Sequence, residues 1–226
     1  DSVASRGLGD VYKRQERLRQ LEQFKTDLLR TAQNQPPFSK NWPMVFEALG
    51  RAMREFKLPL NPLMALLSAF EQDVIYTHEQ RTYRNRTELL DYCSRSANPI
   101  GRLLLHLYGI NDDVALRESD AICTALQLIN FWQDLSVDLP RGRRYLPDHA
   151  SLAEELRFAR SLMHQGEGLV HRIPGRAGWE LRCVVQGGLG ILNKIDHIDP
   201  WTQRPKLHAW DWPSLLWRAA RMRATQ

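Results

Sequence analysis

The chain has 226 residues, of which 43% are hydrophobic and 25% charged, and its formal net charge is +5. This length suits one domain with one core, and the positive charge favours anionic partners such as diphosphates or acidic lipid surfaces. No apolar run approaches the ~20 residues that a membrane-spanning helix needs, and no signal peptide is visible. The arginines are scattered rather than gathered beside stacking aromatic residues, so no nucleic-acid partner is expected.

Hydrophobic periodicity predicts an all-α chain, because no period-two pattern is long enough to build a sheet. Proline and glycine residues separate the amphipathic segments and mark their ends. The predicted helices cover residues 16–33, 42–57, 62–77, 86–109, 118–139, 148–164, 176–197 and 212–224.

Residues 1–15 precede the first predicted helix and lack helical periodicity. This segment is rich in glycine and resembles translated adapter sequence. We therefore expect residues 1–15 to be non-native or disordered, and residues 16–226 to form one helical domain.

The predicted helix over residues 86–109 contains an interruption at Asn98-Pro99-Ile100-Gly101. Pro99 has no backbone donor and Gly101 has no side chain, so the helix should kink here and allow a close approach. Cys93, Cys123 and Cys183 are odd in number and widely spaced among apolar residues. They are typical of free thiols in a reducing compartment, which favours the cytoplasm.

The predicted helix over residues 118–139 carries the strongest functional pattern. Gln127, Asn130, Asp134 and Asp138 fall within roughly 80° of one another on one helical face. Their oxygen atoms suit a hard cation such as Mg²⁺, whereas a solvated acidic face is the simpler interpretation. The other sides of this helix are strongly apolar, which favours carboxylates in a cleft that need a cation.

A cluster of arginines follows directly after this helix. Pro140 ends the helix, and Arg141, Arg143 and Arg144 come within the next four residues. Guanidinium groups bind phosphate oxygens well, so the two clusters together predict a site for a metal–diphosphate pair.

These motifs carry a family resemblance. The run from Gln127 to Asp138, followed by Arg141-Gly-Arg-Arg-Tyr145, resembles the second aspartate-rich motif of the squalene/phytoene synthase family. The blocks around residues 88–109 and 204–217 are similar to the bacterial hopanoid-pathway branch of that family, the hydroxysqualene (or squalene) synthases.

The resemblance implies an isoprenoid synthase-type helical bundle with a central apolar cavity. It implies that Asp134 and Asp138 hold Mg²⁺, that Asn130 contributes to the same metal site, and that Gln127 lines that face. It also implies that Arg141, Arg143 and Tyr145 bind the substrate diphosphate. These residues form the expected catalytic and binding site.

Further roles follow from the same resemblance. Asp73 is either a boundary residue or a cavity-facing carboxylate that stabilises a carbocation or orients water. Gly101 is either part of a kink or a wall for the isoprenoid tail, and Tyr92 either packs in the core or lines the substrate site. The resemblance also implies an Arg-Tyr pair, and it leaves open which of three residues takes that role. They are Arg81, Tyr83 and Arg84.

Family members also carry a first aspartate-rich motif before a helix equivalent to residues 16–33. Asp1 and Asp10 do not reproduce that motif. We expect the chain to be N-terminally truncated, without the first helix that bears half of the metal site. The alternative is a natural, divergent N-terminus.

The implied reaction is the Mg²⁺-dependent conversion of presqualene diphosphate to hydroxysqualene or squalene with release of diphosphate. NADPH is needed only if the product is squalene. One alternative is a sister enzyme that condenses two prenyl diphosphates head to head into presqualene or phytoene diphosphate, and another is a non-catalytic helical scaffold. A presqualene diphosphate synthase is the expected partner, and a peripheral contact with the inner membrane is also expected.

Overall fold

The computed structural model describes the backbone of residues 2–222, with side chains from Tyr12 onward. In this part of the chain the regular structure is helical, and strands are absent. The chain forms two compact units, Asp1–Arg81 and Thr82–Gln226, and each is described by itself. The sequence predicts all-α structure, and the structure confirms it, whereas the expectation of one helical domain over residues 16–226 stays a prediction.

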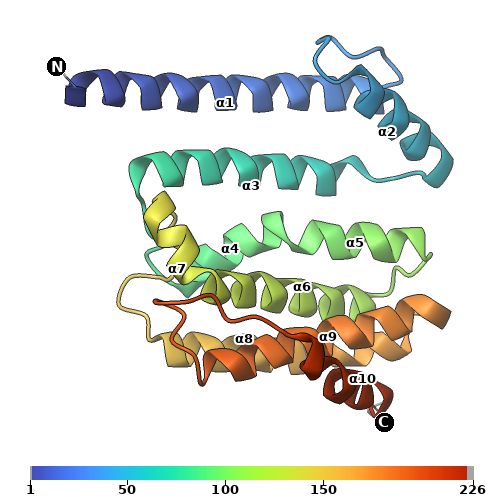
Figure 1. Ribbon diagram of the computed structural model, residues 1–226. Helices are drawn as coiled ribbons and strands as arrows, with labels where there is room; N and C mark the ends of the chain where they lie inside the picture. Colours follow the sequence, from blue (N-terminus) through green and yellow to red (C-terminus); the bar gives the residue numbers. More distant parts are fainter. Residues whose placement is uncertain (1, 223–226) are drawn as a thin grey trace. The chain divides into compact units, whose positions relative to one another are not determined.

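The first unit contains three helices, α1 (Ser2–Ala32), α2 (Pro43–Phe56) and α3 (Leu60–Glu79). Figure 1 shows α3 running back along α1, and α2 also contacts α1. Leu28, Phe46 and Leu67 form its buried core, and Phe24 and Trp42 pack against them. The helices are therefore held together by one apolar cluster to which each contributes.

Helix α1 begins before the predicted first helix. It includes residues 2–15, where the sequence analysis expects a non-native or disordered segment. Gly7 and Gly9 lie within this helix, although glycine in a helix interior is about 1 kcal/mol less favourable than alanine. Helical structure does not decide whether these residues are native, so that expectation stays a prediction.

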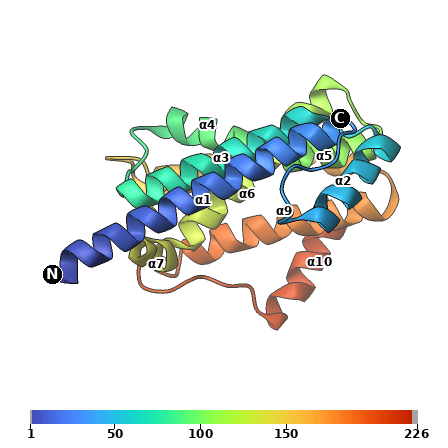
Figure 2. The same ribbon diagram turned by 90° about the horizontal axis from the view of Figure 1, so that it is seen from above.

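The second unit is built around α6 (Asp113–Gln133). Figure 1 shows α6 between α4 (Arg86–Ser96) and α5 (Asn98–Leu107) on one side and α8 (Leu152–Gly166) and α9 (Gly175–Ile195) on the other. In the view from above, α9 runs alongside α6 (Figure 2). Short elements complete the unit: α7 (Leu135–Asp138), α10 (Trp212–Ala220) and the 3₁₀ turns η1 (Leu139–Arg141), η2 (Glu167–His171) and η3 (Ala209–Asp211).

Local sequence signals explain where these helices begin and break. The Asn85 side chain accepts the Glu88 N–H at 3.0 Å, and the Asp112 side chain accepts the Ala115 N–H at 2.9 Å, so both α4 and α6 start with a polar cap. The predicted kink near Pro99 is confirmed, because α4 ends at Ser96 and α5 begins at Asn98.

Two further findings concern the whole of the described chain. Cys93, Cys123 and Cys183 are free thiols, of which Cys93 is buried. Among the described helices, none combines the length and the apolar character that a membrane span requires.

Candidate functional site

The two predicted metal ligands lie at the junction of α6 and α7. Helix α6 ends at Gln133, and Asp134 stands between the two helices with φ −100° and ψ 12°. The Asp134 N–H still donates to the Asn130 carbonyl at 3.0 Å, and the Asp138 N–H donates to the Asp134 carbonyl at 2.8 Å. Asn130, Asp134 and Asp138 therefore follow one another on successive turns, although the predicted continuous helix breaks here.

Asp138 is the more deeply placed of the two carboxylates. It is only 8% exposed, and this burial raises the pKa of its carboxyl group. The nearby negative charge of Asp134 raises the pKa of Asp138 further, whereas Arg143 and Arg141 lower it. Two carboxylates in a partly dehydrated position repel each other, so the site favours a cation between them.

A tight turn returns the arginine cluster to these carboxylates. Pro140 lies in η1, and Gly142 follows in the left-handed conformation at φ +77°, which glycine adopts without strain. The Arg143 N–H donates to the Asp138 carbonyl at 3.1 Å, and its guanidinium lies 3.5 Å from the Asp138 carboxylate. Arg141 is exposed beside this pair, where it is available to an anionic ligand.

Arg204 is a site residue to which the sequence analysis assigns no role. Its guanidinium donates through Nε and, at 3.4 Å, through Nη2 to the two carboxylate oxygens of Asp134. The segment around Arg204 is fixed to the same junction on both sides. The Ser136 N–H donates to the Pro200 carbonyl at 3.0 Å, and Gln133 Nε2 donates to the Pro205 carbonyl at 2.6 Å. Seventy residues separate Arg204 from Asp134, so no local pattern reveals this pair.

Four aromatic rings pack together next to the polar residues. Phe131 and Tyr145 stack with their ring centroids 3.8 Å apart, and Tyr92 lies 6.1 Å from Tyr145. Tyr83 joins the cluster at 5.7 Å from Tyr92. All four rings are buried, and Tyr145 directly follows the arginine turn. The cluster forms a buried aromatic core that follows directly on the polar residues in the chain.

The three candidates for the family's Arg-Tyr pair occupy different surroundings. Tyr83 is only 1% exposed and lies in the aromatic cluster. Arg84 pairs with Glu88 at 3.2 Å on the surface. Arg81 pairs with Glu79 at 3.6 Å and lies over the Tyr76 ring. Tyr83 is therefore the tyrosine that the structure associates with Tyr92 and Tyr145.

Gly101 serves helix packing in this structure. A Cβ atom at this position would lie 2.3 Å from Ser119 Oγ and 2.6 Å from Cys123 Sγ, both on α6. The absence of a side chain thus allows α5 to approach α6 closely. A role for Gly101 as a wall for the isoprenoid tail stays a prediction.

The remaining predicted residues lie on α6 and on α3. Gln127 is half-buried and Asn130 is exposed, one turn apart on the face that leads to Asp134. Asp73 lies in the first unit, where it lines a cleft of about 470 Å³ between α1 and α3 together with apolar residues such as Phe24 and Leu67. The structure thus joins most of the predicted site within the second unit and places Asp73 in the first.

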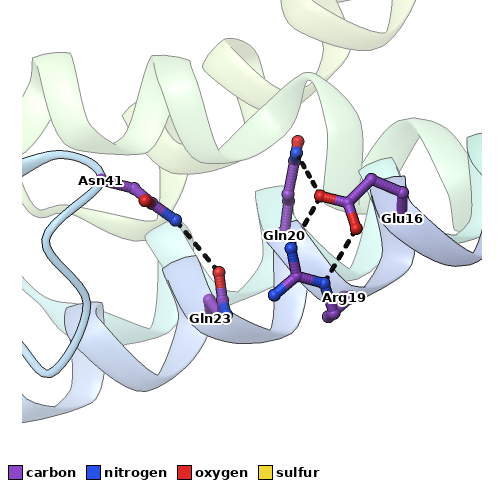
Figure 3. Close-up of polar contacts among 5 residues, drawn as sticks. All are labelled: Glu16, Arg19, Gln20, Gln23 and Asn41. Carbon is purple, nitrogen blue, oxygen red and sulfur yellow. Dashed lines mark hydrogen bonds and ion pairs between the residues drawn. The ribbon is translucent and has the colours of Figure 1, made fainter.

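Glu16 is the first carboxylate of α1 whose side chain the structure describes. Figure 3 shows Glu16 accepting hydrogen bonds from Arg19, at 2.8 and 2.9 Å, and from Gln20 at 2.7 Å. The hydrogen bond from Arg19, with that from Gln20, lowers the pKa of Glu16. Gln23, further along α1, accepts a hydrogen bond from Asn41 at 3.2 Å. Glu16 is therefore a partly exposed carboxylate paired within its own helix, which is a poor replacement for an aspartate-rich metal motif.

The residues at the α6–α7 junction fit a magnesium ion that arrives with a diphosphate. Asp134 and Asp138 offer carboxylate oxygens, and Asn130 offers an amide oxygen one turn earlier. In the described part of the chain no three histidine, cysteine, aspartate or glutamate side chains gather into a metal cage. Mg²⁺ is commonly held by one or two carboxylates together with substrate phosphates and water, and this donor set matches that mode.

Comparisons of the sequence with known proteins identify its family. The family model for squalene/phytoene synthase matches residues 4–151. A hydroxysqualene synthase of Sinorhizobium fredii is 36% identical over 174 residues, which cover 66% of this chain and 58% of that protein. A presqualene diphosphate synthase of Rhodopseudomonas palustris is 29% identical over 138 residues, which cover 59% of this chain and 45% of that protein. The chain thus spans less than two thirds of the length of these relatives.

Solved structures give the same answer for the fold. The crystal structure of squalene synthase HpnC from Alicyclobacillus acidocaldarius matches with a TM-score of 0.71 at 30% identity, over 83% of this chain and 76% of that one. A dehydrosqualene synthase structure matches with a TM-score of 0.65 at 19% identity, over 93% of this chain and 80% of that one, which speaks to the fold alone. The predicted isoprenoid synthase-type bundle is confirmed.

Proposed function

The chain belongs to the squalene/phytoene synthase family, and from this premise we propose that its parent protein converts presqualene diphosphate to hydroxysqualene. The observation that carries the proposal is the α6–α7 junction, where two carboxylates stand beside three arginines from two separate segments. The similarity to a hydroxysqualene synthase supports the choice of substrate.

In the proposed reaction, Asp134 and Asp138, with Asn130 beside them, hold Mg²⁺ against the substrate diphosphate. Bound there, the ion neutralises charge that builds on the diphosphate as it departs. Arg141 and Arg143 donate hydrogen bonds to the diphosphate oxygens and hold it after the carbon–oxygen bond breaks.

The remaining residues would protect and direct the carbocation that is left. The aromatic cluster of Tyr83, Tyr92, Phe131 and Tyr145 excludes water from one wall and presents π electrons to a cation. Asp73, in the first unit, lines a cleft with apolar residues and with Arg17 and Gln20, and its proposed role there is to stabilise a positive charge or to orient a water molecule. Addition of water and loss of a proton give hydroxysqualene, whereas transfer of a hydride from NADPH gives squalene.

A head-to-head condensing enzyme is the second candidate. Presqualene diphosphate synthases and phytoene synthases also match this chain, at 28–32% identity. Such enzymes would use the same carboxylates and arginines, because they also release diphosphate from a prenyl substrate. A non-catalytic scaffold is the third candidate, and the arginine–carboxylate arrangement at one junction argues against it.

The proposed place in a reaction sequence follows from the substrate. Presqualene diphosphate is formed by condensation of two prenyl diphosphates, so a presqualene diphosphate synthase is the proposed partner. We propose that the protein works in the cytoplasm, next to the membrane that receives its apolar product.

The test is a product assay on the parent protein, for which the reaction is proposed. The protein is incubated with presqualene diphosphate, with and without Mg²⁺ and NADPH, and the products are separated by gas chromatography and mass spectrometry. We expect Mg²⁺-dependent hydroxysqualene without NADPH. Squalene formed only with NADPH would change the product, and turnover of farnesyl diphosphate alone would favour the condensing enzyme. The absence of any Mg²⁺-dependent turnover or diphosphate binding would favour the scaffold.

A further inference from the structure

Helix α10 is apolar on the side that it exposes as well as on the side that it buries. Leu215 and Ala219 are buried, and Leu215 packs close to Gly190 of α9. On the exposed side, Trp212 is 51%, Leu216 47% and Trp217 57% exposed. We call these three residues the Trp face of α10. Figures 1 and 2 show α10 lying beside α9 at the C-terminal end of the second unit.

Basic residues border the Trp face. At 100° per residue, Arg221 lies about 40° from Trp217 on the helix circumference, and Arg218 lies about 100° from it on the same side of the Trp face. The Arg221 guanidinium lies 4.1 Å from the centre of the Trp217 ring. The helix itself contains no acidic residue. An apolar arc with a basic border is the pattern of a helix that lies in the surface of an anionic bilayer.

A cleft behind α10 adds a second, independent feature. The cleft has a volume of about 210 Å³ and is lined by Lys194, His197, Ser214 and Arg218, among others. Lys194 pairs with Asp211 at 3.0 Å, which leaves the cleft with an excess of positive charge from Arg218. Arg218 Nε is buried there without a hydrogen-bond partner among the described residues. A phosphate oxygen would satisfy this donor.

We propose that α10 and this cleft form a docking surface for an anionic phospholipid bilayer. The indole rings of Trp212 and Trp217 would lie at the level of the headgroups, where tryptophan is favoured, and Leu216 would enter the acyl boundary. Arg221 and Arg218 would meet the lipid phosphates. This surface is separate from the α6–α7 junction, and the proposal does not depend on the reaction assigned there.

A second copy of the chain fits this face less well. A stable dimer commonly buries about 800 Å² on each partner, whereas three side chains on a nine-residue helix offer much less. Two copies would also bring the same basic border together, and like charges repel. The charge of the border favours an acidic lipid surface instead.

The test is flotation of the full chain with lipid vesicles. Vesicles of phosphatidylcholine alone are compared with vesicles that also contain phosphatidylglycerol. We expect binding to the anionic vesicles, a blue shift of tryptophan fluorescence, and release at high salt. Quenching of that fluorescence by brominated lipids would place the indole rings in the bilayer without any substitution.

Variants assign the binding to α10. The double variant W212S/W217S should lower the vesicle partition coefficient at least about tenfold, because it lacks the two indole rings that the bilayer would bury. R221Q should lower it about fivefold, as expected for one basic residue near an anionic surface. The matched control is Trp179→Ser on α9, since Trp179 is 46% exposed and also has an arginine, Arg182, near its ring. This control should bind as the wild type does.

Several results would overturn the proposal. They are equal binding to neutral and anionic vesicles, unchanged binding of the double variant, and equal loss in the Trp179→Ser control. A wild-type dimer in light scattering that W212S/W217S converts to a monomer would assign the face to a second copy instead.

Discussion

Two buried aspartates, Asp27 in the first unit and Asp138 in the second, show how position gives the same side chain opposite uses. Asp27 is fully buried on α1, and Oδ1 accepts the backbone N–H groups of Phe38 and Ser39 at 2.5 and 3.0 Å. Its Oδ2 accepts the Ser39 hydroxyl at 2.5 Å. Asp138 instead lies beside another carboxylate and faces the Arg143 guanidinium at 3.5 Å.

The difference separates a carboxylate that holds the fold from one that is available for chemistry. The carboxylate oxygens of Asp27 already accept hydrogen bonds from the loop that follows its own helix. Removing this side chain should therefore affect folding alone. Asp138 has a raised pKa and a neighbouring negative charge, so its charged form lowers the stability of the fold. A bound cation would offset that loss of stability.

The largest expected effect is on the carboxylate pair. Asp134→Asn removes one of the two charges that we propose hold Mg²⁺, so Mg²⁺-dependent turnover should fall by about a hundredfold or more. Asp120→Asn is the matched control, because Asp120 also lies on α6 and also pairs with an arginine, Arg102, at 2.6 Å. Equal activity of Asp134→Asn and wild type would assign the pair to structure.

The next effect concerns Asp27, which anchors the loop after α1. Asp27→Ala leaves two backbone N–H groups and the Ser39 hydroxyl without their acceptor, so the free energy of unfolding should fall by about 3 kcal/mol in urea denaturation. The folded variant should still bind Mg²⁺ and inorganic diphosphate as the wild type does, measured by calorimetry. Loss of that binding in a folded variant would mean that Asp27 is more than an anchor.

A substitution at Gly101 tests whether this predicted site residue holds the fold, as Asp27 does, or is available for chemistry, as Asp138 is. Gly101→Ala would force a methyl group against Ser119 and Cys123, so stability should fall by about 1–3 kcal/mol. Gly187→Ala is the control on α9, because the nearest atom to its added Cβ is 3.9 Å away and alanine favours a helix by about 1 kcal/mol. A destabilised G187A together with an unaffected G101A would contradict the packing role.

The smallest effect concerns pH. Burial raises the pKa of Asp138, so in the metal-free folded protein this group keeps its proton to a higher pH than in the unfolded chain. Its contribution to stability is therefore present below the ordinary carboxyl pKa and is lost as the pH rises through the raised value. Asp138→Asn should be the more stable protein at neutral pH, and its advantage should shrink at acidic pH. Urea denaturation at several pH values measures this, and an advantage that grows towards acidic pH would contradict it.

Linear sequence patterns were enough to predict the helical content, the interruption near Pro99 and the spacing of Asn130, Asp134 and Asp138 on successive turns. These features depend on neighbours a few residues apart, through helix periodicity, proline and one helical face, so a linear pattern contains them. The same patterns placed Asp134 and Asp138 one turn apart, and the structure keeps them so despite the break at Asp134.

The distant groups that meet these residues are set by the packing of the helices. Arg204 reaches Asp134 because Pro200 and Pro205 fasten its segment to the α6–α7 junction, and Tyr83 joins Tyr92 and Tyr145 in one aromatic cluster. The same holds for Gly101, whose missing side chain matters only because Ser119 and Cys123 stand opposite. Contacts between residues far apart in the chain arise from the packing of whole helices, and no periodicity in the sequence encodes which side chains those packed faces bring together.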